Sequence, residues 1–261
     1  MATGPSRLGW PRTGVLVTGG ASGIGRASAL ALAEVGRPVA VWDLDGDAAQ
    51  AVADECRSLG VVAHAACVDV AVTSGLSDHV AATAGALGSL GGFVHAAGVS
   101  GAAIVEDLDD ATWDATLDVN LRAAAMLFRE LVTPFRAAGP GSAAVLVSSI
   151  EGHFGSAMLP AYCSSKAGVL GLMRSMAQHL ATDGVRVNAV CPGAVDTPML
   201  APAFDLLPGF RDQVESRTPL GRVSTPDEIA RPIRFLLSDE ASFITGAHLT
   251  VDGGMTAVTA I

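Results

Sequence analysis

Short apolar runs alternate with longer stretches of helical periodicity along most of the chain. The apolar runs predict buried strands at residues 15–18, 38–43, 61–70, 91–98, 143–149, 185–190 and 248–254. The stretches between them predict helices at residues 23–35, 46–59, 73–87, 112–137, 161–182 and 226–237. Because continuous apolar strands joined by helices form parallel sheets covered on both faces, we expect a doubly wound α/β sheet of about seven strands.

Two stretches depart from this alternation. Residues 1–12 combine Gly, Pro and polar residues without an apolar core, so we expect a disordered N-terminal tail there. Residues 13–261 contain no internal linker and are expected to form a single domain. Within that domain, residues 197–220 contain four prolines and interrupt the pattern. Such a stretch covers a site or lies on the surface, and we interpret it as an insertion over the substrate.

The composition disfavours several classes of partner. The formal net charge is −10, and no basic stripe supplies the counterion release that drives nucleic-acid binding. An anionic membrane surface is disfavoured for the same reason, and no apolar run reaches the length of a membrane span. The four Cys form no C-x-x-C pair, and no His lies at metal-finger spacing. We therefore expect reduced thiols, no metal site and a cytoplasmic protein.

A glycine-rich turn follows the first expected strand, at "TGGASGIG" (18–25). Small residues let the backbone approach a pyrophosphate, and the next helix directs its N-terminus at that charge. Asp43 ends the second strand, where its carboxylate can bond ribose hydroxyls and repel a 2′-phosphate. No Lys or Arg lies just before Gly19 or just after Asp43, so NAD is favoured over NADP. An ordinary tight turn and an acid capping a strand end remain the alternatives.

Several further motifs occur in a fixed order along the chain. They are "VDV" around Asp69, "HAAG" (95–98), "DVN" ending at Asn120, "VSS" ending at Ser149, "YCSSK" (162–166), "NAVCPGAVDT" (188–197) and "ITGAHLTVDGG" (244–254). With the glycine-rich turn, they make residues 13–256 resemble the short-chain dehydrogenase/reductase family. The resemblance implies a Rossmann-like dinucleotide-binding catalytic domain, hydride transfer between NAD(H) and a secondary alcohol or ketone, and a homotetramer.

The resemblance also assigns residues to the site. It implies a catalytic set of Asn120, Ser149, Tyr162 and Lys166. The positions that it assigns to cofactor binding are Gly19, Ser22, Gly23, Ile24, Gly25, Asp43, Asp69, Val70, Ala97, Gly98, Tyr162, Lys166, Pro192, Gly193, Val195 and Thr197. Ser148 is the competing candidate for the catalytic serine, and the family spacing to Tyr162 favours Ser149. In the family, the Asn holds a water that relays protons towards the Lys.

Tyr162 is the only tyrosine in the chain and Lys166 is the only lysine, four positions away. Residues at this spacing share one face of a helix. A free phenol titrates near 10 and is a poor proton acceptor at neutral pH, whereas a nearby ammonium favours the phenolate. We therefore expect Lys166, together with the positive charge of the nicotinamide, to lower the pKa of Tyr162, which would act as the general acid and base.

The chain departs from the family at the end of the fourth strand. The family usually has Asn-Asn-Ala-Gly there, whereas this chain has His95-Ala96-Ala97-Gly98. We expect His95 to replace one hydrogen bond and to be structural rather than catalytic. His153 and Phe154 follow Ser149 closely and either line the substrate pocket or lie on the surface. The apolar stretch 199–207 suggests an apolar or cyclic secondary alcohol as substrate.

Two other functions remain open from the sequence. One is an NADPH-dependent 3-ketoacyl-thioester reductase, against which Asp43 argues. The other is a catalytically inactive nucleotide-binding protein on the same fold. The retention of Asn120, Ser149, Tyr162 and Lys166 argues against that reading.

Overall fold

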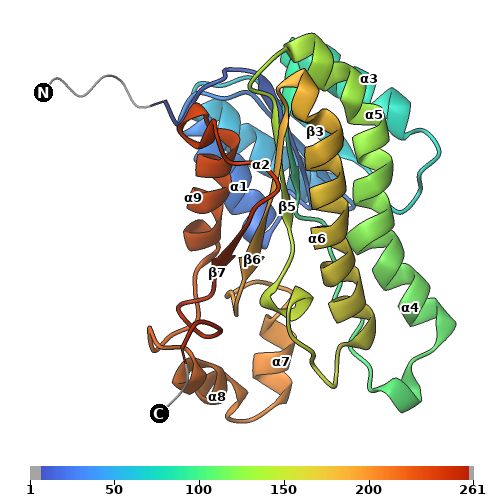
Figure 1. The fold of residues 1–261 in the computed structure, drawn as a ribbon, viewed down its shortest axis with the longest axis vertical. Helices are drawn as coiled ribbons and strands as arrows, with labels where there is room; N and C mark the ends of the chain where they lie inside the picture. The colour runs from blue at the N-terminus through green and yellow to red at the C-terminus, as the bar shows by residue number, and fades with distance from the viewer. Residues whose placement is uncertain (1–6, 259–261) are drawn as a thin grey trace, which may run out of the picture.

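The computed structural model describes residues 7–258, which form a parallel sheet flanked by helices (Figure 1). Within these residues the sheet has seven strands in the order β3-β2-β1-β4-β5-β6-β7, and every neighbouring pair is parallel. The strands are β1 (Gly14–Thr18), β2 (Val39–Asp43), β3 (Ala63–Cys67), β4 (Leu90–His95), β5 (Ala143–Val147), β6 (Arg186–Pro192) and β7 (His248–Val251). The predicted doubly wound fold is confirmed.

The helices follow the predicted alternation closely. They are α1 (Gly23–Ala33), α2 (Gly46–Ser58), α3 (Leu76–Leu87), α4 (Asp110–Leu117), α5 (Ala123–Ala138), α6 (Pro160–Leu180), α7 (Ala201–Leu206), α8 (Phe210–Arg217) and α9 (Pro226–Leu237). Short 3₁₀ turns occur at η1 (Val105–Asp107), η3 (Ile150–Gly152), η4 (Ala181–Asp183) and η5 (Asp239–Ala241). Thr225 caps α9 in a reciprocal capping box with Glu228.

Two apolar layers hold the helices on the sheet. Successive strand residues point to opposite faces, so Leu16 and Phe93 enter one layer while Val15 and Val94 enter the other. The first layer packs against α3, α5 and α6, and the second against α1, α2 and α9. Figure 1 shows α9 and α1 on one side of the strands, and α5 and α6 on the other.

The strand order fixes the position of the site. The chain leaves β1 in one direction towards β2 and β3, and then returns to place β4 on the other side of β1. In such sheets, ligands bind in the crevice outside the carboxyl ends of the strands at this reversal. The segments that leave this edge include those after Thr18, Asp43, His95, Val147 and Pro192.

One predicted helix is interrupted. The stretch 112–137 was expected to be a single helix, but a π-helical turn, η2 (Asp118–Arg122), separates α4 from α5. At its end the Ala123 N–H bonds to the Asp118 carbonyl five residues back. A π turn adds one residue to the helix and rotates the side chains that follow. Asn120 lies in this turn and is fully buried.

The two stretches that broke the sequence pattern pack on the domain. Residues 1–6 of the predicted tail lie outside the described residues. From residue 7 the chain contacts the fold, because Arg7 pairs with Asp239 at 2.6 Å and the Trp10 carbonyl accepts the Asp239 N–H. The stretch 197–220 contains α7 and α8, which lie beyond the carboxyl ends of the strands (Figure 1).

Candidate active site

The glycine-rich turn lies tightly against the end of β4. Gly19 has a φ of +65°, and a Cβ on it would lie 2.6 Å from the Ala97 backbone nitrogen. A Cβ on Gly25 would lie 1.9 Å from the Gly19 carbonyl oxygen. Ser22 is the N-cap residue of α1, but its hydroxyl makes no capping hydrogen bond. The side chain of Ser22 therefore does not occupy the first backbone N–H groups of the helix. This cradle fits the pyrophosphate of a dinucleotide.

Two carboxylates flank the turn at the ends of neighbouring strands. Asp43 accepts the Ala21 N–H at 2.9 Å through one oxygen and the Asp45 N–H at 3.2 Å through the other. Asp69, beyond β3, accepts the Ala71 N–H at 2.9 Å. The structure therefore brings Asp43 onto the glycine-rich turn itself, with a third lone-pair direction left for a ribose hydroxyl.

Gly98 follows Ala97, the residue that contacts Gly19, and lies against Asn120 and Lys166. A Cβ at this position would lie 3.2 Å from Asn120 Oδ1, 3.6 Å from Lys166 Nζ and 3.8 Å from the Met199 methyl group. Side chains from three distant segments thus meet at one glycine. The absence of a side chain at residue 98 keeps this space open for a ligand.

Ser149 and Tyr162 form the hydroxyl pair of the site. Tyr162 follows Pro160, the first residue of α6, and the Ser149 side chain is near enough to its phenol to act against the rise in the phenol pKa. Ser149 also caps the short turn η3, where its Oγ accepts the Glu151 N–H at 3.1 Å. Ser148 instead donates its hydroxyl to the Lys166 carbonyl at 2.9 Å. This geometry supports Ser149 over Ser148 as the partner of Tyr162.

Lys166 lies beneath the phenol and is almost fully buried, with 4% exposure. Its Nζ donates to the Val147 carbonyl at 2.9 Å and lies 5.5 Å from the Tyr162 ring centre. Burial lowers the pKa of Lys166 to about 8, against a smaller opposing effect from Cys191. Burial raises the pKa of Tyr162 to about 12, although the Ser149 side chain acts in the opposite direction.

Within the protein alone, burial shifts the Tyr162 pKa opposite to the direction expected from Lys166 and the nicotinamide charge together. The sequence placed the ammonium one helical turn from the phenol, and attraction was expected to lower the phenol pKa. In the structure the phenol is buried, and the loss of hydration outweighs the stabilising groups around it. Burial of this kind is a tertiary property that the spacing within one helix does not contain.

Asn120 connects the end of β4 with α6. Its Oδ1 accepts the Val99 N–H at 2.9 Å, and its Nδ2 donates to the Val99 carbonyl at 3.0 Å. The same Nδ2 donates to Ser165 Oγ at 2.9 Å, and Ser165 in turn donates to the Tyr162 carbonyl at 2.7 Å. The amide is therefore fixed in one orientation beside Lys166.

The segment after β6 folds back over the glycine-rich turn. Pro192 ends β6, and a Cβ on Gly193 would lie 3.0 Å from the Asp252 Cα. Val195 is buried, and its carbonyl accepts the Thr197 hydroxyl at 3.2 Å. The Thr197 methyl group would lie 3.2 Å from a Cβ on Gly23. This segment therefore borders the same crevice as the glycine-rich turn. It supplies Pro192, Gly193, Val195 and Thr197, and the turn supplies Ser22, Gly23 and Ile24.

Sequence reasoning did not find the contacts that His153 makes with Cys191 and His248. The Cys191 sulfur lies 3.5 Å from His153 Nε2, and the His153 and His248 ring centres are 4.6 Å apart. His153 thus faces the β6–β7 side of the site. Phe154 is 54% exposed. Thirty-eight residues separate Cys191 from His153, so no local pattern could have predicted their contact.

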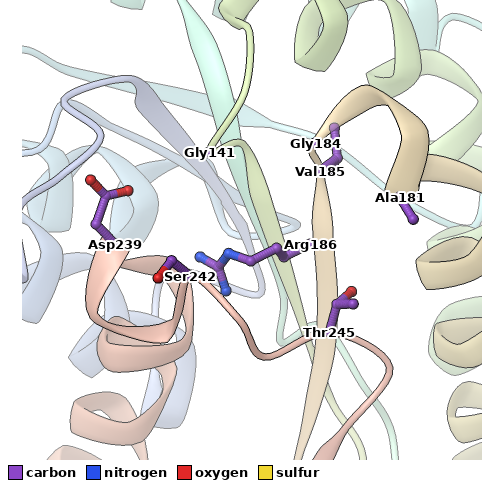
Figure 2. Close-up of a pocket in the computed structure, with 8 residues that line it drawn as sticks. All are labelled: Gly141, Ala181, Gly184, Val185, Arg186, Asp239, Ser242 and Thr245. Atoms are coloured by element: carbon purple, nitrogen blue, oxygen red, sulfur yellow. The ribbon is translucent and has the colours of Figure 1, made fainter.

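A cavity of about 270 Å³ lies at the opposite end of the sheet, where β5 and β6 begin (Figure 2). Figure 2 shows the Arg186 side chain extending from its strand towards Ser242. The Arg186 guanidinium donates to the Leu236 carbonyl at 2.7 Å and to the Ser238 carbonyl at 3.0 Å. These bonds satisfy the carboxyl end of α9, so this arginine has a structural role.

The described residues contain neither a cluster of metal-ligating side chains nor a candidate membrane span. Across residues 7–258, no group of three or more His, Cys, Asp or Glu side chains is arranged to hold a metal ion. Over the same residues, no helix has both the length and the apolar character needed to cross a membrane.

Comparisons with known proteins agree with this geometry. A family model described as enoyl-(acyl carrier protein) reductase matches residues 19–256. A short-chain type dehydrogenase/reductase from Mycobacterium marinum has a similar solved structure, with a TM-score of 0.90, 30% identity, and coverage of 97% of this chain and 98% of that one. The chain belongs to the short-chain dehydrogenase/reductase family.

Two curated relatives of this family member act on ring alcohols, as their names state. The cis-4-hydroxycyclohexanecarboxylate dehydrogenase of Sinomonas cyclohexanicum is 43% identical over 249 residues, which cover 93% of this chain and 96% of the relative. The cyclohexanol dehydrogenase of Acinetobacter sp. strain SE19 is 36% identical over 242 residues, with coverage of 92% and 94%. This short-chain dehydrogenase/reductase is an oxidoreductase that uses a nicotinamide cofactor on a secondary alcohol or ketone.

Proposed function

We propose that Tyr162 is the general acid and base of this oxidoreductase, and that Ser149 orients the reacting oxygen of the substrate. The positions of the two hydroxyl groups support the proposal, because Ser149 follows β5 and Tyr162 lies in the first turn of α6, with the Lys166 ammonium 5.5 Å from the phenol ring centre. A substrate oxygen in reach of both groups would accept one hydrogen bond from each. The bound dinucleotide would supply the hydride acceptor or donor.

The two shifted pKa values define what the side chains do at neutral pH. A Tyr162 pKa of about 12 keeps the phenol protonated, so it is ready to donate to a ketone oxygen. Alcohol oxidation needs the reverse transfer, and positive charge near the phenol favours it. The buried Lys166 ammonium is one source of that charge, and Asn120 fixes the segment on which Ser165 and Lys166 lie.

NAD, rather than NADP, is the proposed cofactor, and the position of Asp43 is the main support for this proposal. Its carboxylate is bonded to the Ala21 N–H on the glycine-rich turn, where a 2′-phosphate would meet a negative charge. Arg26, on the helix after the turn, pairs with Glu55 at 2.6 Å. The proposed binding residues are those named from the family motifs, from Gly19 to Thr197.

The proposed substrate is a cyclic secondary alcohol. The names of both curated relatives support it, as does the stretch 199–207, where Met199, Leu206 and Leu207 are exposed apolar side chains. The test is an NAD-coupled screen of cyclohexanols with and without a ring carboxylate, together with sugars, steroids and open-chain alcohols. We expect turnover of a cyclohexanol, which Tyr162→Phe reduces at least about a thousandfold while NAD binding persists. Turnover of open-chain alcohols alone would contradict the substrate proposal.

A reductase acting on acyl thioesters is the second candidate, favoured by the description of the matching family model. Reduction of acetoacetyl thioesters with NADPH, at an efficiency above that for any alcohol with NAD, would favour this second function. Binding of NAD without turnover of any compound would favour an inactive nucleotide-binding protein.

We further propose a cytoplasmic homotetramer. Four free cysteines suit a reducing compartment. Phe243 is fully exposed and Leu249 on β7 is 41% exposed, so apolar side chains lie along the free edge of the sheet. Light scattering that gives the mass of a single chain would refute the assembly.

A further inference from the structure

His95 joins two segments of the site at the carboxyl edge of the sheet. It is 1% exposed and lies opposite Thr18 in the register of β4 and β1. Its Nδ1 lies 2.9 Å from Thr18 Oγ1, and its Nε2 lies 3.2 Å from the Val119 carbonyl oxygen. The imidazole therefore spans from the last residue before the glycine-rich turn to the π turn η2.

The partners of the two ring nitrogens determine the tautomer. A carbonyl oxygen only accepts hydrogen bonds, so the proton lies on Nε2 and points at Val119. Nδ1 is then the acceptor of the Thr18 hydroxyl. Burial, with a smaller contribution from the Lys166 charge, lowers the pKa of His95 to about 3, so the ring is neutral at neutral pH. Both hydrogen bonds consequently have a fixed direction.

The hydrogen bond from His95 to the Val119 carbonyl lies at the π turn η2, where the backbone departs from α-helical hydrogen bonding. In an α-helix the Val119 carbonyl would accept the Ala123 N–H, but Ala123 bonds to Asp118 instead. The carbonyl accepts the His95 Nε2–H, and the same ring interacts with the Asn120 backbone. A π turn usually marks a functional position, and here it holds the buried Asn120 side chain.

Asn120 transmits the position of the π turn to the catalytic helix. Its amide bonds Val99 on one side and Ser165 on the other, next to Lys166. We infer that His95 is a positioning residue: its Nε2–H holds the Val119 carbonyl and thereby fixes Asn120 against α6. The effect on turnover rests on the proposed function of the site, whereas the effect on Asn120 does not.

Three substitutions separate the two bonds of the imidazole. His95→Gln places an amide N–H near the position of Nε2 and keeps the Val119 bond. His95→Asn is too short to reach Val119 but keeps an acceptor for the Thr18 hydroxyl. His95→Leu removes both bonds at a similar volume. The matched control is His79→Leu, which removes a histidine that contacts the Trp42 ring far from the catalytic residues.

The kinetic expectation follows from the Val119 bond. His95→Leu and His95→Asn should each lower kcat at least about tenfold, with alcohol KM and NAD dissociation constant within about twofold of the unsubstituted enzyme. His95→Gln should retain kcat within about threefold, and His79→Leu should leave it unchanged. If His95→Leu does not fold, the comparison of kcat between His95→Asn and His95→Gln tests the inference. Full activity of His95→Asn, or equal losses in Gln and Asn variants, would overturn the inference.

A second measurement does not depend on turnover. Hydrogen exchange of the Asn120 side-chain amide, followed by NMR, should be slow in the unsubstituted enzyme and in His95→Gln. It should be at least about tenfold faster in His95→Asn, while backbone amides of β5 keep their protection. Unchanged Asn120 exchange in His95→Asn would refute the positioning role. If no alcohol is turned over, the proposed function fails, and this exchange measurement still decides the role of His95.

Discussion

The Lys166 ammonium lies 5.5 Å from the centre of the Tyr162 ring and gives its hydrogen bond to the Val147 carbonyl. The only tyrosine and the only lysine of the chain are therefore neighbours, but in the described structure the phenol hydroxyl and the ammonium are not hydrogen-bonded to each other. Burial shifts their pKa values in opposite directions, upward for the phenol and downward for the ammonium. Both shifts favour the neutral forms.

The phenol ionisation can be followed directly, because Tyr162 is the only tyrosine. With a pKa of about 12, the folded protein should show little tyrosinate absorbance at about pH 11, where an ordinary phenol is mostly ionised. The unfolded chain in denaturant serves as the control. Since the folded pKa is raised, this group stabilises the fold fully below about pH 10 and loses that contribution as pH rises through about 12. A folded-state transition near the ordinary phenol value would contradict the burial argument.

Lys166 should lower the free energy of unfolding at neutral pH, because its charged form is buried. Replacing it by Met removes a buried charge, so Lys166→Met should raise the free energy of unfolding at pH 7 by roughly 1–3 kcal/mol while abolishing turnover. The folded pKa is lowered to about 8, so the wild-type penalty is full below that pH and diminishes towards the ordinary value of 10.5. Urea unfolding at pH 7 and at about pH 10 tests this, and an advantage that grows with pH would refute it.

Arginine should not replace Lys166, although it is the usual cation of this chain. The Nζ donates to one carbonyl in a fully packed position, where a broad guanidinium fork does not fit. We expect Lys166→Arg to lower kcat at least about tenfold in the alcohol assay. An Arg variant with wild-type kcat would show that only the positive charge matters.

The two adjacent serines should behave differently. Ser149→Ala removes the hydroxyl near the Tyr162 phenol and should lower kcat at least about a hundredfold. Ser148→Ala removes a bond to the Lys166 carbonyl and should act mainly on stability, by roughly 1 kcal/mol. Steady-state kinetics and thermal unfolding of both variants separate the roles. Similar kcat losses in the two variants would disprove the assignment.

Asp43 should control the choice of cofactor. Asp43→Ser removes the charge from the glycine-rich turn and should reduce the NAD:NADP ratio of kcat/KM at least about tenfold. The matched control is Asp45→Ser, which removes an equal charge nearby and keeps a residue that can cap α2. A change of similar size in the control would mean that general charge, rather than the position of Asp43, sets the preference.

Gly98 should tolerate no side chain. In Gly98→Ala the new methyl group would lie 3.2 Å from Asn120 Oδ1 and 3.6 Å from Lys166 Nζ, so kcat should fall at least about tenfold. Gly85→Ala is the control, because a Cβ there meets nothing within 4 Å. In the last turn of α3 that change should stabilise the fold by roughly 0.5–1 kcal/mol without affecting kcat. Equal kinetics of the two variants would contradict the crowding at Gly98.

The parts predicted correctly from the sequence are those that local patterns encode. Apolar runs place the strands because a buried parallel strand needs them, and the helix predicted at residues 226–237 matches α9 at both ends. The π turn at Asn120 was missed, because one extra residue in a helix leaves the apolar periodicity almost unchanged. The effect of burial on the Tyr162 pKa was missed, because desolvation depends on what the rest of the chain packs over the phenol.

The burial of Lys166 has a consequence for the chemical handling of the protein. The chain displays no lysine side chain other than this one, and only 4% of it is accessible. Crosslinkers and labels that acylate lysine amines therefore find no reactive side chain on the protein surface. Mapping an assembly of this enzyme therefore relies on carboxyl-directed reagents or on the exposed Cys67 thiol, and any acylation of Lys166 would measure how often the active site opens.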